Sequence, residues 1–370
     1  MKKRIFVITG EVSGDILASK IINYIDLNKI EIKGIVGSNL KNKGIDGPFE
    51  NNDITFFGIT DVIKNIFHIK KKIDQTIRYI ETFKPDIVFS VDSPDFVFQV
   101  IKKIKKRRKI KTKFFHFVAP SIWAWRESRG RNIKKLIDKI YLLFKFEKKY
   151  FDKYSINNKF VGHPFFENFK NSNDYFNSEK KIISFCPGSR KKEIHMFMPV
   201  FLEIIKYYNN KYKYHFAVTK ETEDIVREYL FKLKNNDFFI NVDENQKKDF
   251  LKNSLITIAK SGTISLDLCK LQVPFITIYK LSWMNYFIIK PFVKVKYVNI
   301  INIIANKEVV PELIQSNCNS KKIIAKLEDF FKNKSKLKKL IDDYNIVLNE
   351  LSNKDSSKQI ADDLIRNINQ

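Results

Sequence analysis

Glycine, cysteine and long apolar runs are scarce in this sequence, and each shortage excludes a class of protein. The 370 residues include 11 glycines, about half the usual share, so the remaining glycines carry information about turns. Hydrophobic residues make up 44% and charged residues 29%, which excludes wholesale disorder and a fibrous repeat. The length predicts two domains.

The three cysteines cannot form a structural framework. Cys186, Cys269 and Cys318 are widely spaced and odd in number, which excludes a disulfide framework and a C-x-x-C metal or redox site. The apolar run near the N-terminus is too short for a signal peptide. No apolar stretch approaches the roughly 20 residues that cross a bilayer. These absences predict a cytoplasmic protein without a membrane-spanning helix.

Acidic residues are outnumbered by basic ones. Lysine and arginine total 68 against 41 acids, which gives a net charge of +27 and favours nucleic acid, phosphorylated metabolites or a membrane surface as partners. Nine basic residues lie between Lys102 and Lys113. This run lacks interleaved aromatics and falls where a crossover helix is expected, so we predict a solvated helix face or an anionic-membrane contact rather than a nucleic-acid site.

Short β-branched or aromatic runs alternate with longer amphipathic ones, which is typical of α/β units around parallel sheets. We predict a first domain over residues 1–165, a second over 166–345 and a C-terminal helical segment over 346–370, with a linker from Phe165 to Lys180. The expected strands are Arg4–Thr9, Ile32–Val36, Asp86–Val91, Lys113–Val118, Lys139–Leu143, Ile182–Cys186, Tyr214–Val218, Phe238–Val242, Leu255–Ala259 and Pro274–Tyr279.

In the first half of the chain, candidate catalytic and binding residues stand where the predicted strands end. The turn GEVSGD, which contains Gly10, Glu11, Ser13 and Gly14, is not a dinucleotide fingerprint. Its glycines either bring backbone close to a substrate or belong to an ordinary turn with Ser13 or Asp15 as helix cap. Asp92 follows a buried strand, and partial burial would raise its pKa toward that of a general base.

Other candidates in this half have structural alternatives. We predict that Asp95 only caps the next helix. Trp125 and Arg126, in the segment APSIWAWR, form either a ligand platform or a packed loop. His163 faces the expected hinge and is a candidate substrate contact, although a lone histidine is more often structural. The histidines show no metal-binding spacing, so we predict no metal.

In the second half, two turns between a strand and a helix carry small and basic residues. The first contains Gly188, Ser189 and Arg190, and the second contains Ser261, Gly262 and Thr263. Helix N-termini bind phosphate, and an arginine adds a forked donor. Asp267 lies one turn beyond Thr263 and could accept from ribose hydroxyls. Together these turns favour a nucleotide-phosphate site over two ordinary capped helices.

An amphipathic segment from Gly58 to Ile73 carries apolar residues followed by lysines. Ile63, Ile66 and Phe67 would insert into a membrane surface if the helix is interfacial. They would be buried if the helix faces the core. The sequence gives these two interpretations equal weight.

The motifs GEVSGD, DSPDF, APSIWAWR, FVGHP, CPGSR, SGTISLD and VPEL occur in an order that resembles the lipid-A-disaccharide synthase family, which is glycosyltransferase family 19. The resemblance covers essentially the whole chain. It implies a GT-B fold with two Rossmann-like domains, and a final helix that often returns to the first domain. It also implies metal-independent, inverting transfer of 2,3-diacylglucosamine from UDP to the 6-hydroxyl of 2,3-diacylglucosamine 1-phosphate at the cytoplasmic face of the inner membrane, without a cofactor.

The resemblance also implies roles for individual residues. It makes Asp92 the general base, Glu11 a second essential acid and Arg190 the diphosphate ligand. The Ser261 turn and Asn302 become nucleotide contacts. The family has glutamate where Asp267 stands, so the ribose contact is a departure from the family pattern.

Two rival hypotheses stay open, and so does the oligomeric state. One keeps the fold but makes the chain a peptidoglycan N-acetylglucosaminyltransferase or a UDP-sugar epimerase, against which the WAWR segment argues. The other is a basic nucleic-acid-binding protein, which depends on the net charge alone.

Overall fold

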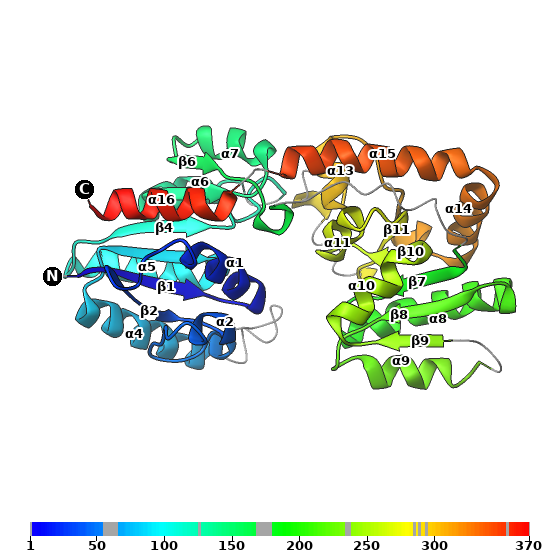
Figure 1. The fold of residues 1–370 in the computed structure, drawn as a ribbon, viewed down its shortest axis with the longest axis horizontal. Coiled ribbons are helices and arrows are strands. Elements are labelled where there is room, and N and C mark those ends of the chain that lie inside the picture. Colours follow the sequence, from blue (N-terminus) through cyan, green and yellow to red (C-terminus); the bar gives the residue numbers. More distant parts are fainter. Residues whose placement is uncertain are drawn as a thin grey trace. The chain divides into compact units, whose positions relative to one another are not determined.

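The structure is a computed structural model, and it describes residues 2–54, 66–124, 127–167, 180–233, 238–283, 286–287, 290–292, 295–352 and 355–369. The chain forms two compact units, Met1–Asn168 with Leu351–Gln370 and Phe169–Glu350 (Figure 1). The boundaries predicted at residues 165 and 345 lie a few residues before these divisions. Residues 168–179 of the predicted linker lie outside the described part of the chain.

The first unit is built on a six-stranded sheet with the order β2-β1-β3-β4-β5-β6, and all neighbouring strands are parallel. Its strands are β1 (Lys3–Thr9), β2 (Ile30–Ile35), β3 (Ile87–Val91), β4 (Lys113–Phe117), β5 (Lys139–Leu142) and β6 (Asn158–Phe160). Its helices are α1 (Val12–Ile22), α2 (Ser38–Lys41), α4 (Ile66–Phe83), α5 (Pro94–Arg107), α6 (Arg129–Leu136), α7 (Lys148–Asp152) and α16 (Ser356–Ile368). Every residue of β3 is buried, as expected of a central parallel strand with both faces covered.

The second unit repeats this plan with the strand order β12-β11-β10-β7-β8-β9, again with parallel neighbours. Its strands are β7 (Ile182–Cys186), β8 (Lys213–Ala217), β9 (Phe238–Asn241), β10 (Ser254–Lys260), β11 (Phe275–Tyr279) and β12 (Glu312–Ile314). Its helices are α8 (Lys191–Tyr208), α9 (Glu223–Leu230), α10 (Glu244–Lys252), α11 (Ile264–Lys270), α13 (Ile300–Ala305), α14 (Ser320–Lys332) and α15 (Lys334–Leu351).

The predicted α/β class and all the predicted strands are confirmed, with ends that differ by one or two residues. Sequence patterning missed β6 and β12, because each has only three residues and no residue in either is fully buried. Such strands are too short to show a period of two. Each extends an existing sheet at its edge.

The C-terminal helix α16 belongs to the first unit, although the chain reaches it through α15. Asp363 of α16 accepts a hydrogen bond from the Tyr141 hydroxyl at 2.7 Å and pairs with Lys139 at 2.6 Å. Lys113 donates to the carbonyl of Asn367 at 2.7 Å. These contacts hold α16 against β4 and β5, in agreement with the expected return of the last helix.

Within the described residues, no helix is both long enough and apolar enough to cross a membrane.

A serine and histidine pair recurs in the interior of both sheets. Ser90 of β3 lies opposite His116 of β4, and its Oγ is 2.8 Å from the ring Nδ1. Ser184 of β7 lies opposite His215 of β8 with the same 2.8 Å separation. Burial lowers the pKa of His116 to about 3 and that of His215 to about 4. Both rings are therefore neutral in the folded protein at neutral pH.

The burial of His116 predicts a pH-dependent contribution to stability. In the unfolded chain the ring has a pKa of about 6.5. As the pH falls below that value, the unfolded chain binds a proton that the folded chain cannot, and about 1.4 kcal/mol of stability is lost per pH unit. His116→Phe, which leaves Ser90 bonded to the Phe115 carbonyl, should therefore destabilise the protein less at pH 5 than at pH 6.5.

Denaturant unfolding of both proteins at the two pH values measures this difference, which should be about 1.6 kcal/mol. The wild-type protein alone would not reveal this effect, because two buried carboxyl groups change its stability with pH in the opposite direction. Burial raises the pKa of Glu147 to about 7 and that of Asp267 to about 6, so as the pH falls these groups bind protons in the folded state first and stabilise it. The difference between variant and wild type cancels their contribution. The exposed His68, replaced by Gln, is the control. An equal cost at both pH values would contradict the assignment.

Candidate active site

The turn between β1 and α1 presents polar side chains at the carboxyl end of the first sheet. Glu11 and Ser13 are exposed, whereas Gly14 and Asp15 are buried. Glu11, in extended conformation, takes the N-cap position of α1. The prediction that Ser13 or Asp15 caps this helix is therefore wrong. Asp15 instead accepts hydrogen bonds from the backbone N–H groups of Gly37 at 2.7 Å and Asn39 at 2.9 Å.

Asp92 follows β3 in a turn with unusual backbone geometry. Asp92 and Ser93 both have positive φ angles, of 63° and 47°, which L-residues adopt at an energetic cost. The Asp92 N–H donates to the carbonyl of Phe117 at 3.0 Å, and the Ser93 N–H donates to Asp92 Oδ1 at 2.7 Å. The carboxylate is therefore held by the strained turn itself.

The glycines of the first turn make room for this second turn. A Cβ atom on Gly10 would lie 1.7 Å from Ser93 Oγ, and one on Gly14 would lie 3.0 Å from the carbonyl oxygen of Val91. The strands β1 and β3 are neighbours, with Thr9 opposite Val91. The structure thus brings Gly10, Gly14 and Asp92 together, and the space beside Gly10 is filled by the Ser93 side chain. Sequence patterning did not identify Ser93.

Burial raises the pKa of Asp92, and the hydrogen bond from the Ser93 N–H only partly opposes this effect. An acid with a raised pKa binds a proton more readily than an exposed aspartate and is a better general base near neutral pH. The geometry and the electrostatics of Asp92 therefore suit proton abstraction.

Asp95 has a different role from the one predicted. It lies in the first turn of α5, whose N-cap position is Ser93. Its carboxylate forms an ion pair with Arg129 at the start of α6. The prediction that Asp95 serves as a helix cap is therefore wrong, and Asp95 links α5 to α6.

The tryptophan-rich segment is anchored by a buried acid. Trp123 is buried, and its indole N–H donates to Glu147 Oε1 at 3.2 Å. Glu147 is 3% exposed, and burial raises its pKa to about 7. For Trp123 the packed-loop interpretation holds. Trp125 and Arg126 lie outside the described residues.

His163 lies among aromatic rings. Its Nδ1 accepts the N–H of Phe165 at 3.2 Å, and its ring packs near Phe144, Phe165 and Phe166. These contacts agree with the structural interpretation of this histidine.

The second unit contains a cavity of about 320 Å³ at the carboxyl ends of β7, β8 and β10. It brings together five of the predicted residues: Gly188, Ser189, Gly262, Thr263 and Asp267. Burial raises the pKa of Asp267 to about 6, to which Glu244 contributes and which Lys248 and Lys270 oppose. An acid of this kind can accept hydrogen bonds from hydroxyl groups at neutral pH.

Charged residues that sequence patterning did not identify also line this cavity. Lys260 Nζ lies 3.0 Å from Glu193 Oε1, and Lys247 Nζ lies 2.8 Å from Glu244 Oε1. The sequence contains features that could have identified two of these residues. Lys260 directly precedes the Ser261 turn, and Glu193 has the spacing of a helix capping residue after Arg190. The walls of the cavity therefore carry both signs of charge.

Two predicted nucleotide contacts lie outside the cavity lining. Ser261 Oγ donates to the carbonyl of Val298 at 3.0 Å. Asn302 is fully buried and its amide bonds to the backbone of Val310 and to Glu312. Both side chains are used to hold the segment around α13.

Arg190 occupies the N-cap position of α8, and its side chain is exposed. Its positive charge acts on Tyr279 at the end of β11, which is separated from β7 by β10 in the sheet. The guanidinium is not part of the cavity lining. It lies at the same carboxyl edge of the second sheet as the cavity.

Among the described residues, no group of three or more histidine, cysteine, aspartate or glutamate side chains could hold a metal ion.

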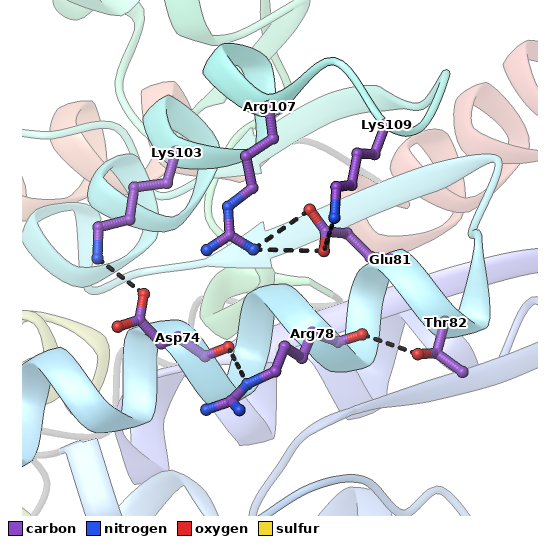
Figure 2. Close-up of polar contacts among 7 residues, drawn as sticks. All are labelled: Asp74, Arg78, Glu81, Thr82, Lys103, Arg107 and Lys109. Carbon is purple, nitrogen blue, oxygen red and sulfur yellow. Dashed lines mark hydrogen bonds and ion pairs between the residues drawn. The ribbon is translucent and has the colours of Figure 1, made fainter.

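The basic run from Lys102 to Lys113 begins within α5, and several of its side chains make contacts within the protein (Figure 2). Lys103 bonds to Asp74 of α4 at 2.9 Å, and Arg107 and Lys109 reach Glu81 at 3.3 and 4.0 Å. The Lys103 hydrogen bond lowers the pKa of Asp74. These pairs join α4 to α5 and agree with the prediction of a solvated helix face.

The predicted membrane segment is exposed at its described end. Ile66 is 43% and Phe67 is 81% exposed at the start of α4, so the core-facing alternative is wrong for these two residues. It holds further along the helix, where Ile73 and Ile77 are buried. Ile63 lies outside the described residues.

Solved structures place this architecture in a known class. The S. aureus MnaA structure determined with UDP aligns with a TM-score of 0.68 at 14% identity, over 99% of this chain and 97% of that chain. MurG of Acinetobacter baumannii aligns with a TM-score of 0.59 at 11% identity, over 98% and 99%. At these identities the likeness shows the fold alone, which is that of the GT-B glycosyltransferases and related epimerases.

Sequence comparison narrows this class to one family. The chain is 33% identical over 363 residues to lipid-A-disaccharide synthase of Rickettsia bellii, with 94% of each chain covered, and 32% identical to that of Rickettsia prowazekii, with 90% of each covered. A family profile described as lipid-A-disaccharide synthetase matches residues 5–364. The chain belongs to the lipid-A-disaccharide synthase family, as the motifs predicted, and is a glycosyltransferase enzyme.

The contact between Gly10 and Ser93 predicts the effect of one substitution. Gly10→Ala forces a Cβ atom against Ser93 Oγ at 1.7 Å and Ser93 Cβ at 2.1 Å, which must displace the Asp92 turn. A displacement of about 1 Å can cost about 100-fold in rate. We expect disaccharide formation to fall by about that factor, while UDP binding, measured by calorimetry, is unchanged.

A second substitution tests the cause of this loss. Ser93→Gly removes both clashing atoms and is compatible with the positive φ at this position. The double variant Gly10→Ala/Ser93→Gly should regain most of the activity. A double variant as inactive as Gly10→Ala alone would show that the clash is not the cause.

Proposed function

We propose that this enzyme transfers 2,3-diacylglucosamine from its UDP conjugate to the 6-hydroxyl of 2,3-diacylglucosamine 1-phosphate, with inversion at the sugar carbon. The observation that carries this proposal is the partly buried Asp92 in its strained turn. In the reaction, Asp92 takes the proton of the acceptor hydroxyl and the acceptor oxygen forms the new bond to the sugar carbon. The bond from that carbon to the UDP oxygen breaks, and UDP leaves with the bonding electrons.

The nucleotide is proposed to bind in the cavity of the second unit. The cavity lies at the carboxyl ends of parallel strands, where ligands bind in open α/β sheets. Backbone N–H groups near Gly188 and Gly262 would contact the diphosphate, with Arg190 as a charged donor. Asp267 would accept from the ribose. The S. aureus MnaA structure with UDP and the Neisseria meningitidis epimerase bound to UDP-GlcNAc share the fold, which supports a UDP-sugar donor.

Departing UDP accumulates negative charge in the transition state, and positive groups at the diphosphate therefore accelerate the reaction. A preorganised donor of this kind is worth roughly 2.7 to 4 kcal/mol. The positive groups in this proposal all belong to the protein, namely Arg190 and the turn amides.

The decisive experiment is product analysis. The purified protein is incubated with UDP-2,3-diacylglucosamine and 2,3-diacylglucosamine 1-phosphate, and mass spectrometry should show the disaccharide 1-phosphate and UDP. The same protein with UDP-N-acetylglucosamine alone should give no epimer. Epimer without disaccharide would contradict the proposal and favour the epimerase hypothesis.

Asp92→Asn should lower turnover by about 100-fold or more, because general-base catalysis contributes a factor of about 10² to 10⁴ to the rate. UDP binding should remain intact in this variant. Arg190→Ala is the contrasting variant, because the loss of the proposed diphosphate donor should weaken UDP binding as well as turnover. The base must be ionised to accept a proton, and burial raises the pKa of Asp92. As the pH is lowered, the turnover of the wild-type enzyme should therefore begin to fall at a higher pH than it would with an exposed aspartate as the base. Near-normal turnover of Asp92→Asn would exclude this residue as the base.

We further propose that the enzyme works at the inner face of the inner membrane, with the start of α4 in contact with lipid. Both substrates carry acyl chains. Ile66 and Phe67 are exposed, and the exposed Lys70 and Lys71 follow them. Apolar insertion and attraction to anionic lipid then act together. Lys72 contributes less, because it pairs with Asp53 at 2.5 Å.

Ile66→Ser/Phe67→Ser should weaken sedimentation with vesicles that contain anionic lipid by about tenfold or more, since each apolar side chain contributes about 1.5 to 3 kcal/mol when buried. The melting temperature should not change, because both side chains are exposed. Phe231→Ser removes another aromatic, 92% exposed, and serves as the control. Equal loss in both variants, or a lowered melting temperature, would contradict the assignment.

A further inference from the structure

The cavity of the second unit already contains an anionic group of the protein. Glu193 lies in the first turn of α8, and its Oε2 accepts the N–H of Arg190 at 3.3 Å. The same oxygen lies 2.2 Å from the position that a Cβ atom on Gly188 would take. Gly188 has a φ of 108°, which favours glycine. The turn therefore places a carboxylate where the N-terminus of a helix favours negative charge.

A lysine from the neighbouring strand binds the other oxygen of this carboxylate. Lys260, the last residue of β10, places Nζ 3.0 Å from Glu193 Oε1. The side chains are 23% and 16% exposed, so solvent screens the pair only in part. Both residues line the cavity together with Gly188 and Gly262. The ion pair thus connects the two turns in which a diphosphate is proposed to bind.

A helix cap alone does not explain this arrangement. A capping glutamate needs only the bond to the N-cap N–H, which here is the longer of the two contacts. A bound diphosphate would share the same small cavity with the carboxylate, and like charges at close range repel. The carboxylate and the diphosphate would therefore compete for one set of positive groups.

We propose that Glu193 is a positioning residue that occupies the phosphate-binding turn as an internal anion, and that Lys260 moves from Glu193 to the diphosphate when the donor binds. The proposal rests on the proposed function, because it requires that UDP binds in this cavity. When UDP leaves, Glu193 pairs with Lys260 again. The ion pair therefore weakens the binding of the nucleotide and favours its release.

The test measures UDP binding by calorimetry in Glu193→Gln, Lys260→Met and the double variant. Glutamine keeps an oxygen that can accept the Arg190 N–H but carries no charge. We expect Glu193→Gln to bind UDP about tenfold more tightly, which corresponds to about 1.4 kcal/mol, with an unchanged melting temperature. Lys260→Met should bind UDP more weakly in both backgrounds, because the lysine contacts the diphosphate and does not only neutralise Glu193.

Two controls separate this role from a general effect of charge. Asp243 caps α10 by accepting the N–H groups of Asn245 and Gln246, each at 3.0 Å, and lies outside the cavity lining. Asp243→Asn removes one negative charge from the same unit and should leave UDP affinity unchanged. Uridine, which has no phosphate, should bind Glu193→Gln and wild type equally.

Each outcome decides the proposal. Equal or weaker UDP binding by Glu193→Gln overturns it, as does an equal gain in Asp243→Asn or with uridine. Wild-type protein that binds no UDP overturns the proposed nucleotide site and this inference together. Wild-type protein that binds UDP without the expected gain in the variant overturns this inference alone.

Discussion

Parallel strand pairing is the constraint on which the rest of this structure depends. Every neighbouring pair in both sheets is parallel, so all the turns from strand to helix leave a sheet at one edge. In the first unit this edge brings the Gly10 turn against Asp92. In the second unit it brings the turn after β7 beside the turn after β10. Within each unit, candidate functional residues that are far apart in the sequence therefore lie close together at the carboxyl ends of the strands.

Several of the many basic residues form ion pairs between the helices that cover the sheets. Lys103, Arg107 and Lys109 pair with acids of α4. Surface pairs of this kind contribute about 0 to 1 kcal/mol each, so their main effect is on orientation. Lys139, by contrast, pairs with the buried Asp363 of the returning helix. The nucleic-acid hypothesis depended on charge alone, and the ion pairs with α4 show that part of the basic run is already neutralised by acids of the protein.

Local sequence patterns were sufficient to predict ten of the twelve described strands and the turns that follow them, and they singled out Asp92 as a candidate. Short β-branched runs identify strands, and an acid after a buried strand lies at the sheet edge. Contacts between segments could not be predicted. Ser93 matters because register places it against Gly10, and Lys260 matters because β10 pairs with β7. Asn302 was assigned to the nucleotide by resemblance, whereas its amide holds the backbone of Val310.

Among the places with a positive φ angle, two are strand ends where an acid is held. Asp92 and Ser93 adopt this left-handed backbone conformation after β3, and Gly188 adopts it after β7. At Asp92 the cost in stability orients a carboxylate whose pKa burial raises, which suits proton transfer. At Gly188 the conformation admits the Glu193 carboxylate to the turn in which a diphosphate is proposed to bind. An enzyme must release its product as well as bind its donor, and the internal anion that we propose would favour release without any loss of the positive groups that the transition state requires.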